Sequence, residues 1–335
     1  MDNKWDEIIP EHLHDTAREA LSSAFGSMQV TSVQPVLGGA SGALTYRIVV
    51  GGHFYLLRME TRRNRLRNPH QYGCMRIASD AGVAPPLRYA DDPSGVAILD
   101  FVSHRRLQEY PGGPAGLAAA IGRLTATLQA TRPFPVLGDY RVIIDRMLGY
   151  VRPSFAGGLL DPHLEGFALI RQAYPWAASM HVSSHNDPNP GNILFDGERL
   201  WLIDWETAFL NDPLTDIAIL TQNHAPTPEL EDVFLQSWLG RPPDRGLRAC
   251  LVLMQQMTRL YYAGILLVTS IAGFAPVTDI SAPTPPEFHA LIAGGQLKVG
   301  TPETKFVLGK VFLAGFMACL NTPDFKDALA IARHG

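Results

Sequence analysis

Apolar and polar residues alternate over much of the first hundred positions, after one segment with helical spacing. Residues 10–26 (PEHLHDTAREALSSAFG) place apolar residues on one helical face and end at Gly26, which predicts a helix. Residues 30–60 alternate in polarity, are rich in Val, Tyr and Leu, and contain two glycine pairs, so three strands are expected. A short helix near 72–81 and two strands within 82–102 complete a small region built around a sheet.

Helical spacing dominates after about residue 102. It recurs over residues 116–130, 212–222, 229–239, 247–267, 302–320 and 324–334. Two exceptions are a pair of short strands around the Asp196-Gly197 turn and a Pro- and Thr-rich loop over 274–288, either a functional flap or a disordered excursion. A sheet followed by helices predicts an α+β fold with two lobes, residues 1–102 and 103–335, and a cleft between them.

Composition narrows the class of protein but does not name a function. The chain has 335 residues, of which 46% are hydrophobic and 18% charged, as in a soluble globular protein of two domains. A formal charge of −4 argues against nucleic acid as a partner, and no run of Lys and Arg suggests a membrane surface. The three cysteines are far apart, which argues against both a disulfide framework and a zinc site, so free thiols are expected.

Two segments bear on location. Residues 260–277 carry no charge, but the Tyr, Thr, Ser, Gly and Pro among them favour a core helix over a membrane span. The N-terminal residues MDNKWDEIIPEHLHD are acidic and lack the apolar run of a signal peptide. We therefore expect a cytoplasmic protein without a membrane partner.

The densest group of polar residues in an apolar context is HVSSHNDPNPGNILFDGERLWLIDWE, residues 181–206. His181 and His185 would share a face of a helix and could bind a metal, but Pro188 and Pro190 disfavour a helix and no third ligand is evident. A second interpretation is a simple turn, because Asp, Asn, Pro and Gly all favour turns.

A third interpretation uses the carboxylates and amides together. A hairpin of the two short strands would bring Asn192 and Asp204 to the same end, where a neutral oxygen and a carboxylate suit a hard cation such as Mg²⁺. Asp187 would lie beside the metal without binding it and could accept a proton from a substrate hydroxyl. Phosphoryl transfer requires this combination of positioning, charge neutralisation and a carboxylate that orients the nucleophile.

Two motifs, SHNDPNPGNILF and LIDWETAFLNDPLTDIA, resemble the Brenner motif and the following Asp motif of the aminoglycoside phosphotransferase and choline kinase superfamily. The IDWE…NDP…D form is more similar to the choline-kinase-like branch. The resemblance implies a protein-kinase-like fold, with a small N-terminal lobe containing an antiparallel sheet and a larger, mainly helical C-terminal lobe. It also implies an enzyme that uses ATP and Mg²⁺.

The resemblance assigns a role to each motif residue. It makes Asp187 the catalytic base, and Asn192 and Asp204 the ligands of Mg²⁺. Asn189 lies where relatives often place a polar residue near the γ-phosphate. Two further residues receive structural roles. His185 would brace the catalytic loop, and Asp216 would anchor the backbone of this loop from the start of a helix.

A nucleotide-binding half follows from the same resemblance. LGGASGALTYRI would be the loop that covers the phosphates, through Gly38, Gly39, Ser41 and Gly42. Arg58 in FYLLRME would grip phosphate oxygens. In AILDFVSH, backbone groups of Asp100 and Val102 would meet the adenine.

This half departs from the family pattern at one point. The helix glutamate that pairs with the basic strand residue is expected near Gly73, where only Gln71 and Tyr72 are adjacent. Either Arg58 is held by another group, or the nucleotide site is weakened and the protein is a pseudokinase or scaffold.

The phosphate acceptor is the least defined part. Glu206 corresponds to the Glu of the IDxE motif, and aromatic residues could surround a quaternary ammonium by cation–π attraction: Tyr261, Tyr262, Trp238 and Trp176. We expect a kinase that acts on the hydroxyl of a small amine-bearing molecule such as choline. An aminoglycoside or other antibiotic kinase is the alternative within the class, and a metal hydrolase is a more distant one. The choice between ATP and GTP and the oligomeric state stay open.

Overall fold

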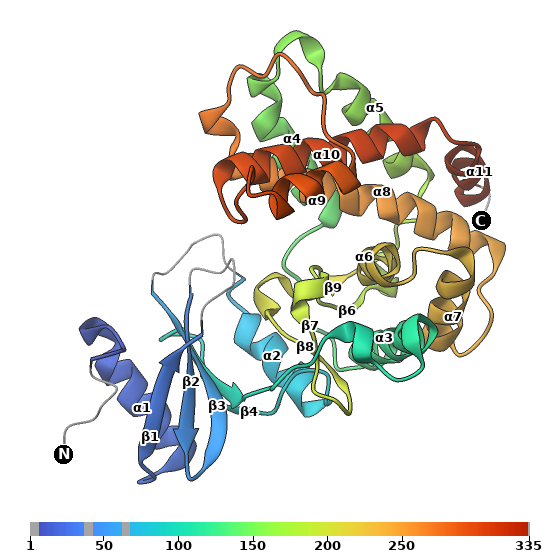
Figure 1. Cartoon of the computed structure of the whole chain (residues 1–335). Coiled ribbons are helices and arrows are strands. Elements are labelled where there is room, and N and C mark those ends of the chain that lie inside the picture. Colours follow the sequence, from blue (N-terminus) through green and yellow to red (C-terminus); the bar gives the residue numbers. More distant parts are fainter. Residues whose placement is uncertain (1–6, 37–42, 62–67, 334–335) are drawn as a thin grey trace. The chain divides into compact units, whose positions relative to one another are not determined.

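The structure is a computed structural model that describes residues 7–36, 43–61 and 68–333 (Figure 1). Its contacts divide the chain into two compact units. The first contains Met1–Leu137, His181–Asp216 and Asn223–Arg241, and the second contains Gly138–Met180, Ile217–Gln222 and Pro242–Gly335. The sheet therefore shares a unit with the segment that carries Asp187, Asn192 and Asp204, while the predicted division at residues 102 and 103 stays a prediction.

A five-stranded antiparallel sheet forms the first part of the first unit, in the order β1-β2-β3-β5-β4. The strands are β1 (Val30–Pro35), β2 (Ala43–Val50), β3 (His53–Glu60), β4 (Leu87–Asp91) and β5 (Val96–Asp100). Helix α1 (His14–Phe25) precedes them and ends at Gly26, whose φ of 64° suits glycine. The predicted first helix and all five predicted strands are confirmed.

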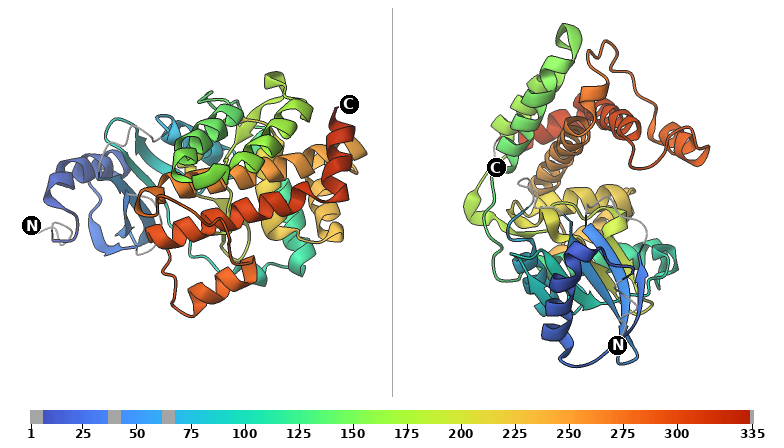
Figure 2. Two further views of the ribbon diagram at one scale, coloured as in Figure 1. Left: turned by 90° about the horizontal axis from the view of Figure 1, so that it is seen from above. Right: turned by 90° about the vertical axis from the view of Figure 1, so that its left-hand side faces the viewer.

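Alternation along the strands separates two faces of this sheet. Tyr46, Ile48 and Val50 of β2 and Leu57 and Met59 of β3 are buried in one core cluster with residues of α1. Figures 1 and 2 show α1 beside the sheet. Because side chains alternate in a strand, Arg58 and Glu60 point to the opposite face. That face receives helix α2 (Gln71–Asp80), close to the predicted short helix.

The rest of the first unit surrounds the polar segment 181–206. Helix α3 (Gly113–Gln129) packs against α7 (Pro228–Leu239). Strands β7 (Ile193–Phe195) and β8 (Leu200–Leu202) form the expected hairpin. A second pair, β6 (Val182–Ser184) with β9 (Phe209–Asn211), was not predicted, because three-residue strands containing two serines give no clear alternation.

Helices build the second unit. They are α4 (Tyr140–Val151), α5 (Asp161–Ala173), α8 (Arg245–Val268), α9 (Pro285–Ala293), α10 (Pro302–Leu320) and α11 (Pro323–Ala332). Helix α8 lies beside α10 and also contacts α4 and α11 (Figure 2). Residues 217–222 of α6 (Leu214–His224) belong to this unit as well.

The uncharged segment 260–277 is helical only in part. Helix α8 ends at Val268, and a 3₁₀ turn follows at Ile271–Gly273. By length and composition α8 is the one described helix that could span a membrane, or one of two if α10 and α11, bent by 76°, count as a single span. Of its most apolar window, 61% is buried inside the protein, as in a core helix.

The Pro- and Thr-rich segment 274–288 contains defined structure. Val277 pairs with Phe155, and its N–H donates to the carbonyl of Ser154 at 2.7 Å. Helix α9 begins inside the segment, with Thr284 and Glu287 forming a capping box. A disordered excursion is therefore wrong for these residues, and a role as a flap stays a prediction.

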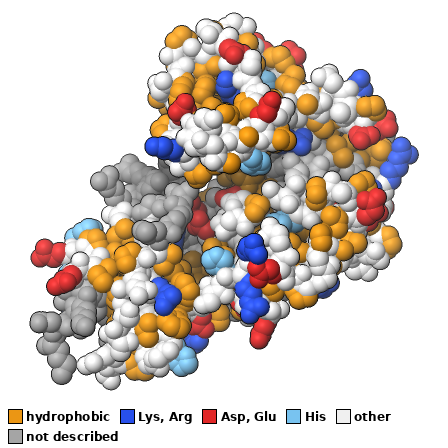
Figure 3. Space-filling view, in the orientation of Figure 1, with side chains coloured by type: hydrophobic (Ala, Val, Ile, Leu, Met, Phe, Trp, Pro, Cys, Tyr) orange, Lys and Arg blue, Asp and Glu red, His pale blue; other side chains and the backbone are white. Residues whose placement is uncertain are grey.

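Charged side chains are dispersed on the face drawn in Figure 3. Among the described residues visible there, Lys and Arg lie singly or beside Asp and Glu and form no broad basic area. This distribution agrees with the formal charge of −4.

Candidate active site

The β7–β8 hairpin brings the two proposed metal ligands together. Ile193 pairs with Leu202, and the N–H of Ile203 donates to the carbonyl of Asn192 at 3.0 Å. Asn192 precedes the first strand and Asp204 follows the second, so both lie at the same end of the hairpin. The predicted juxtaposition is confirmed, and it arises because the Asp196-Gly197 turn sets the register of two three-residue strands.

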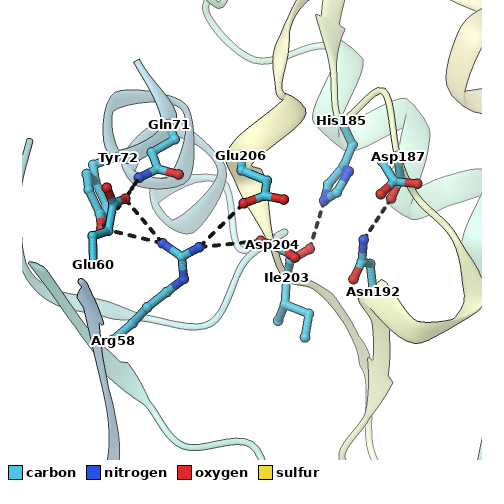
Figure 4. A network of polar contacts seen from close by, with 10 residues as sticks. All are labelled: Arg58, Glu60, Gln71, Tyr72, His185, Asp187, Asn192, Ile203, Asp204 and Glu206. Atoms are coloured by element: carbon cyan, nitrogen blue, oxygen red, sulfur yellow. Dashed lines mark hydrogen bonds and ion pairs between the residues drawn. The ribbon is translucent and has the colours of Figure 1, made fainter. Parts of the chain in front are cut away.

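Asp187 lies in the loop before this hairpin, and loop amides fix its position. Asn192 Nδ2 donates to the backbone carbonyl of Asp187 at 2.9 Å, and Asn189 Nδ2 donates to Asp187 Oδ1 at 3.2 Å. Asn189 Oδ1 in turn accepts from the N–H of Gly191 at 2.9 Å. The three motif residues thus support one another, which holds the Asp187 carboxylate at a defined place beside Asn192 (Figure 4).

A buried carboxylate holds the start of the loop that contains Asp187. Asp216, near the start of α6, accepts from the N–H of His185 at 2.8 Å and from the N–H of Asn186 at 2.7 Å. Complete burial raises the pKa of Asp216, while His185 and the two N–H donors act against this rise. The contacts are those that the predicted anchoring role of Asp216 requires.

His185 is buried and contacts other parts of the protein through its ring. Its Nε2 lies 2.8 Å from the carbonyl of Ile203, and because a carbonyl only accepts, Nε2 carries the hydrogen. Its ring packs on Trp205, with centroids 4.8 Å apart. This ties the loop that contains Asp187 to the residue before Asp204, which suits the predicted bracing role. Among the residues that the structure describes, no group of three or more His, Cys, Asp and Glu is arranged as a metal site.

Two positioning residues were missed by sequence reasoning. Asn186 has a positive φ of 64° and its Nδ2 lies within 3.3 Å of the carbonyls of Ser184, Thr207 and Phe209. Thr207 Oγ1 donates to the carbonyl of His185 at 2.9 Å. The one available signal was the Asn itself, which tolerates the left-handed region better than most residues.

Arg58 faces the end of the hairpin from the sheet. Its Nη2 lies 3.7 Å from Asp204 Oδ1 and 3.8 Å from Glu206 Oε2 (Figure 4). Its Nη1 lies 3.6 Å from Glu60 Oε1 and donates to the hydroxyl of Tyr72 at 3.4 Å. Of the two alternatives for Arg58, the structure agrees with the first: another group holds it, and the acid beside Nη1 is Glu60 of β3.

The hairpin end fits a hard cation. Asp204 Oδ1 is buried and accepts no hydrogen bond from the residues that the structure describes, and a buried carboxylate oxygen is costly in that state. Asn192 uses its nitrogen to reach Asp187, which leaves its carbonyl oxygen as the group to offer a ligand. One carboxylate and one amide oxygen are donors that Mg²⁺ prefers, together with phosphate oxygens and water.

The structure describes some of the remaining residues proposed to bind the nucleotide and not others. Gly38, Gly39, Ser41 and Gly42 lie outside the described residues. The side chain of Asp100 accepts from Arg88 Nε and Nη2 at 2.6 and 2.7 Å, and its N–H donates to the carbonyl of Pro86 at 2.9 Å. The carbonyl of Asp100 is then the backbone group it could offer to adenine, and contacts by Asp100 and Val102 stay predictions.

The aromatic candidates for substrate binding are engaged with other side chains. In the second unit, Tyr261 is buried and stacks on Tyr140 at 5.1 Å, and Tyr262 stacks on Phe312 at 5.3 Å. In the same unit, Trp176 lies 4.9 Å from the guanidinium of Arg141. In the first unit, Trp238 Nε1 donates to Gln129 at 2.9 Å. Cys74, Cys250 and Cys319 are free, as expected.

Comparisons with known proteins agree on a family. Residues 32–250 match the model of the phosphotransferase enzyme family. Among curated proteins, LicA of Haemophilus influenzae is 43% identical over 57 residues, which cover 17% of this chain and 21% of that protein. The chain matches only 16% to 21% of the length of such curated relatives.

Solved structures extend the similarity to most of the chain. A choline/ethanolamine kinase family protein from Mesorhizobium loti has a TM-score of 0.68 and 22% identity, covering 96% of this chain and 100% of that one. Spectinomycin phosphotransferase in complex with ADP and spectinomycin has a TM-score of 0.54 and 12% identity, covering 95% and 97%.

The chain belongs to the phosphotransferase enzyme family, because the family model matches more than half of it. The expected superfamily is confirmed, and so is the expected α+β, kinase-like fold. The structural neighbours come from both the choline-kinase-like and the antibiotic branches.

Proposed function

We propose that this protein is an ATP- and Mg²⁺-dependent kinase that transfers the γ-phosphoryl group to a hydroxyl of a small, amine-bearing molecule. One observation carries the proposal. Asp187, Asn192 and Asp204 lie on a single loop and hairpin, and the guanidinium of Arg58 faces Asp204 within 3.7 Å. Family membership and a structural neighbour that holds ADP support the use of a nucleotide.

Each residue has a distinct task in this reaction. Asp187 accepts the proton of the substrate hydroxyl as its oxygen attacks the γ-phosphorus and ADP leaves with the bridging oxygen, and Asn189 keeps that carboxylate oriented. Asn192 and Asp204 would hold Mg²⁺, which when bound neutralises phosphate charge. Arg58 provides a fork of N–H donors for phosphate oxygens. His185 and Asp216 keep the loop backbone in place.

The acceptor is inferred at the level of chemical class. The IDWE motif and the likeness to a choline/ethanolamine kinase family protein favour an amino alcohol. The likeness to spectinomycin phosphotransferase keeps an antibiotic as the second candidate. The Glu60 carboxylate beside Arg58 favours a kinase over a pseudokinase, because it replaces the charge of the absent helix glutamate. We also propose a cytoplasmic location, where ATP is available.

A substrate screen tests the proposal. Purified protein is supplied with ATP or GTP and Mg²⁺, and ADP or GDP release is measured against amino alcohols, sugars, nucleosides, aminoglycosides and macrolides. We expect release with at least one amino alcohol, and release slower by about 10²- to 10⁴-fold from the Asp187→Asn variant. Equal release by both proteins would contradict the role of Asp187. Nucleotide binding without transfer to any acceptor would favour the pseudokinase.

A further inference from the structure

The acid beside Arg58 Nη1 comes from the same strand. Arg58 and Glu60 are two residues apart on β3, so both side chains point to the face away from the α1 core. Arg58 Nη1 lies 3.6 Å from Glu60 Oε1. The side chain of Arg58 is 9% exposed and that of Glu60 is 13% exposed, so water screens this pair weakly.

Helix α2 holds that acid by hydrogen bonds. Gln71 Nε2 donates to Glu60 Oε1, and the hydroxyl of Tyr72 donates to the same oxygen at 3.1 Å (Figure 4). Gln71 and Tyr72 are both buried. Burial raises the pKa of Tyr72, so its phenol stays protonated and able to donate. These two residues stand where the missing helix glutamate was expected.

The backbone around Glu60 leaves little room for the acid to move. The N–H of Glu60 donates to the carbonyl of Gly95 at 2.9 Å. A Cβ added to Gly95 would lie 2.9 Å from the Glu60 Cβ, and Gly95 has a φ of +69°. Glycine at this turn therefore permits the close approach that seats the Glu60 side chain against α2.

We propose that Glu60, held by Gln71 and Tyr72, is the positioning residue that orients Arg58 toward the nucleotide phosphates. In this chain α2 supplies two neutral hydrogen-bond donors, Gln71 and Tyr72, and β3 supplies the negative charge of Glu60. The inference rests on the proposed function in that it assigns phosphate binding to Arg58. It adds that Glu60 draws the guanidinium away from the two carboxylates on its other side.

That competition has a measurable consequence. Arg58 Nη2 faces Asp204 and Glu206, and Asp204 is a proposed ligand of Mg²⁺. If Glu60 loses its charge, the acids that the described residues place beside the guanidinium are Asp204 and Glu206, so Arg58 shifts toward the hairpin and competes with the cation for Asp204. We therefore expect Glu60→Gln to raise both the KM for ATP and the Mg²⁺ concentration that gives half-maximal rate, each by about tenfold.

An exchange of the acid and the amide provides the sharpest test. Glu60→Gln removes the charge, and Gln71→Glu alone places two buried carboxylates in contact, which lowers activity and melting temperature. The double variant Glu60→Gln/Gln71→Glu moves the acid to α2 and keeps an amide–carboxylate pair, so we expect it to recover most of the affinity for ATP. Asp15→Asn on the exposed surface of α1 is the matched control and should change neither constant.

The outcomes are distinguishable from failure of the proposed function. An unchanged KM for ATP and an unchanged Mg²⁺ requirement in Glu60→Gln, or a double variant no better than Glu60→Gln, would overturn the inference. If the wild type transfers no phosphate, the affinity for a fluorescent ATP analogue with Mg²⁺ serves as the readout, and equal affinity in Glu60→Gln overturns it too. If Glu60→Gln does not fold, Tyr72→Phe removes the shared hydroxyl and should raise the same constants by a smaller factor.

Discussion

The Asp187 carboxylate and the amide of Asn189 differ in what each contributes to the proposed reaction. Asp187→Asn keeps the shape of the side chain but cannot accept the substrate proton, so we expect kcat to fall by about 10²- to 10⁴-fold with little change in the KM for ATP. Asn189→Ala removes one hydrogen bond to Asp187 Oδ1 and should lower kcat by less than about tenfold.

Steady-state kinetics at saturating Mg²⁺ measure both effects. A similar loss in the two variants would mean that Asp187 acts through loop structure and not as a base. Melting temperatures within a few degrees of the wild type would show that neither variant has lost the fold.

At the scale of elements, Asp216 links α6 to the loop that contains Asp187. Its two oxygens accept separate N–H groups of His185 and Asn186. Asp216→Asn offers only one acceptor oxygen, so one buried N–H loses its partner and the protein should be destabilised by about 1–3 kcal/mol. Chemical denaturation measures this change, with the exposed Asp15→Asn as the control. A loss no larger than that of the control would show that the loop does not depend on Asp216.

Elements with a strong local pattern could be predicted from the sequence. Alternating residues defined β2 and β3, and the Asp196-Gly197 turn defined the β7–β8 hairpin, which placed Asn192 beside Asp204. The pairing of β6 with β9 could not be predicted, because it joins two three-residue strands that are distant in the chain.

The partner of Arg58 was missed for a similar reason. The family pattern directs attention to α2, whereas the acid lies two residues along β3 and is reached from Gln71 and Tyr72 only after the sheet and helix pack together. Local spacing does not specify which side chains meet across two elements. Asn186 escaped notice because its contacts reach Thr207 and Phe209 across the folded loop.

At the scale of the whole molecule, each unit contains a buried histidine with a lowered pKa, which makes the folded protein less stable at acidic pH. Burial lowers the pKa of His224 in the first unit from 6.5 to about 4, and burial also lowers the pKa of His163 in the second. In the unfolded chain each of these histidines binds a proton at about pH 6.5, whereas in the folded chain it does so only at lower pH. This contribution to stability is fully present above about pH 6.5 and is lost as the pH falls, for His224 down to about pH 4, by at most about 1.4 kcal/mol per pH unit for each group.

Melting temperatures between pH 7.5 and 5 test this expectation. His224→Gln removes one titrating group and should reduce the fall in melting temperature across that range. The exposed His53→Gln is the matched control and should leave the fall unchanged. A His224→Gln curve parallel to that of the wild type would contradict the assignment.

Two residues of the site have a backbone conformation that suits glycine. Among the described residues, Asn186 and Asp204 are the non-glycine residues with positive φ, at 64° and 66°. Such conformations are unfavourable for residues with a Cβ, and they are concentrated at functional sites. We expect Asp204→Gly to be more stable than Asp204→Ala by about 1 kcal/mol, while neither variant transfers phosphate. Thermal denaturation and ADP release measure the two properties, and an Asp204→Gly variant no more stable than Asp204→Ala would show that the backbone is unstrained.

This strain has a consequence for sequence design. A procedure that optimises stability on this backbone would favour glycine at position 204, because glycine fits φ of 66° without penalty. The designed protein would fold well and lose the carboxylate that faces Arg58. If the proposed role of Asp204 is correct, stability and activity favour different residues at this position, and a redesign that aims at an active enzyme would keep Asp204.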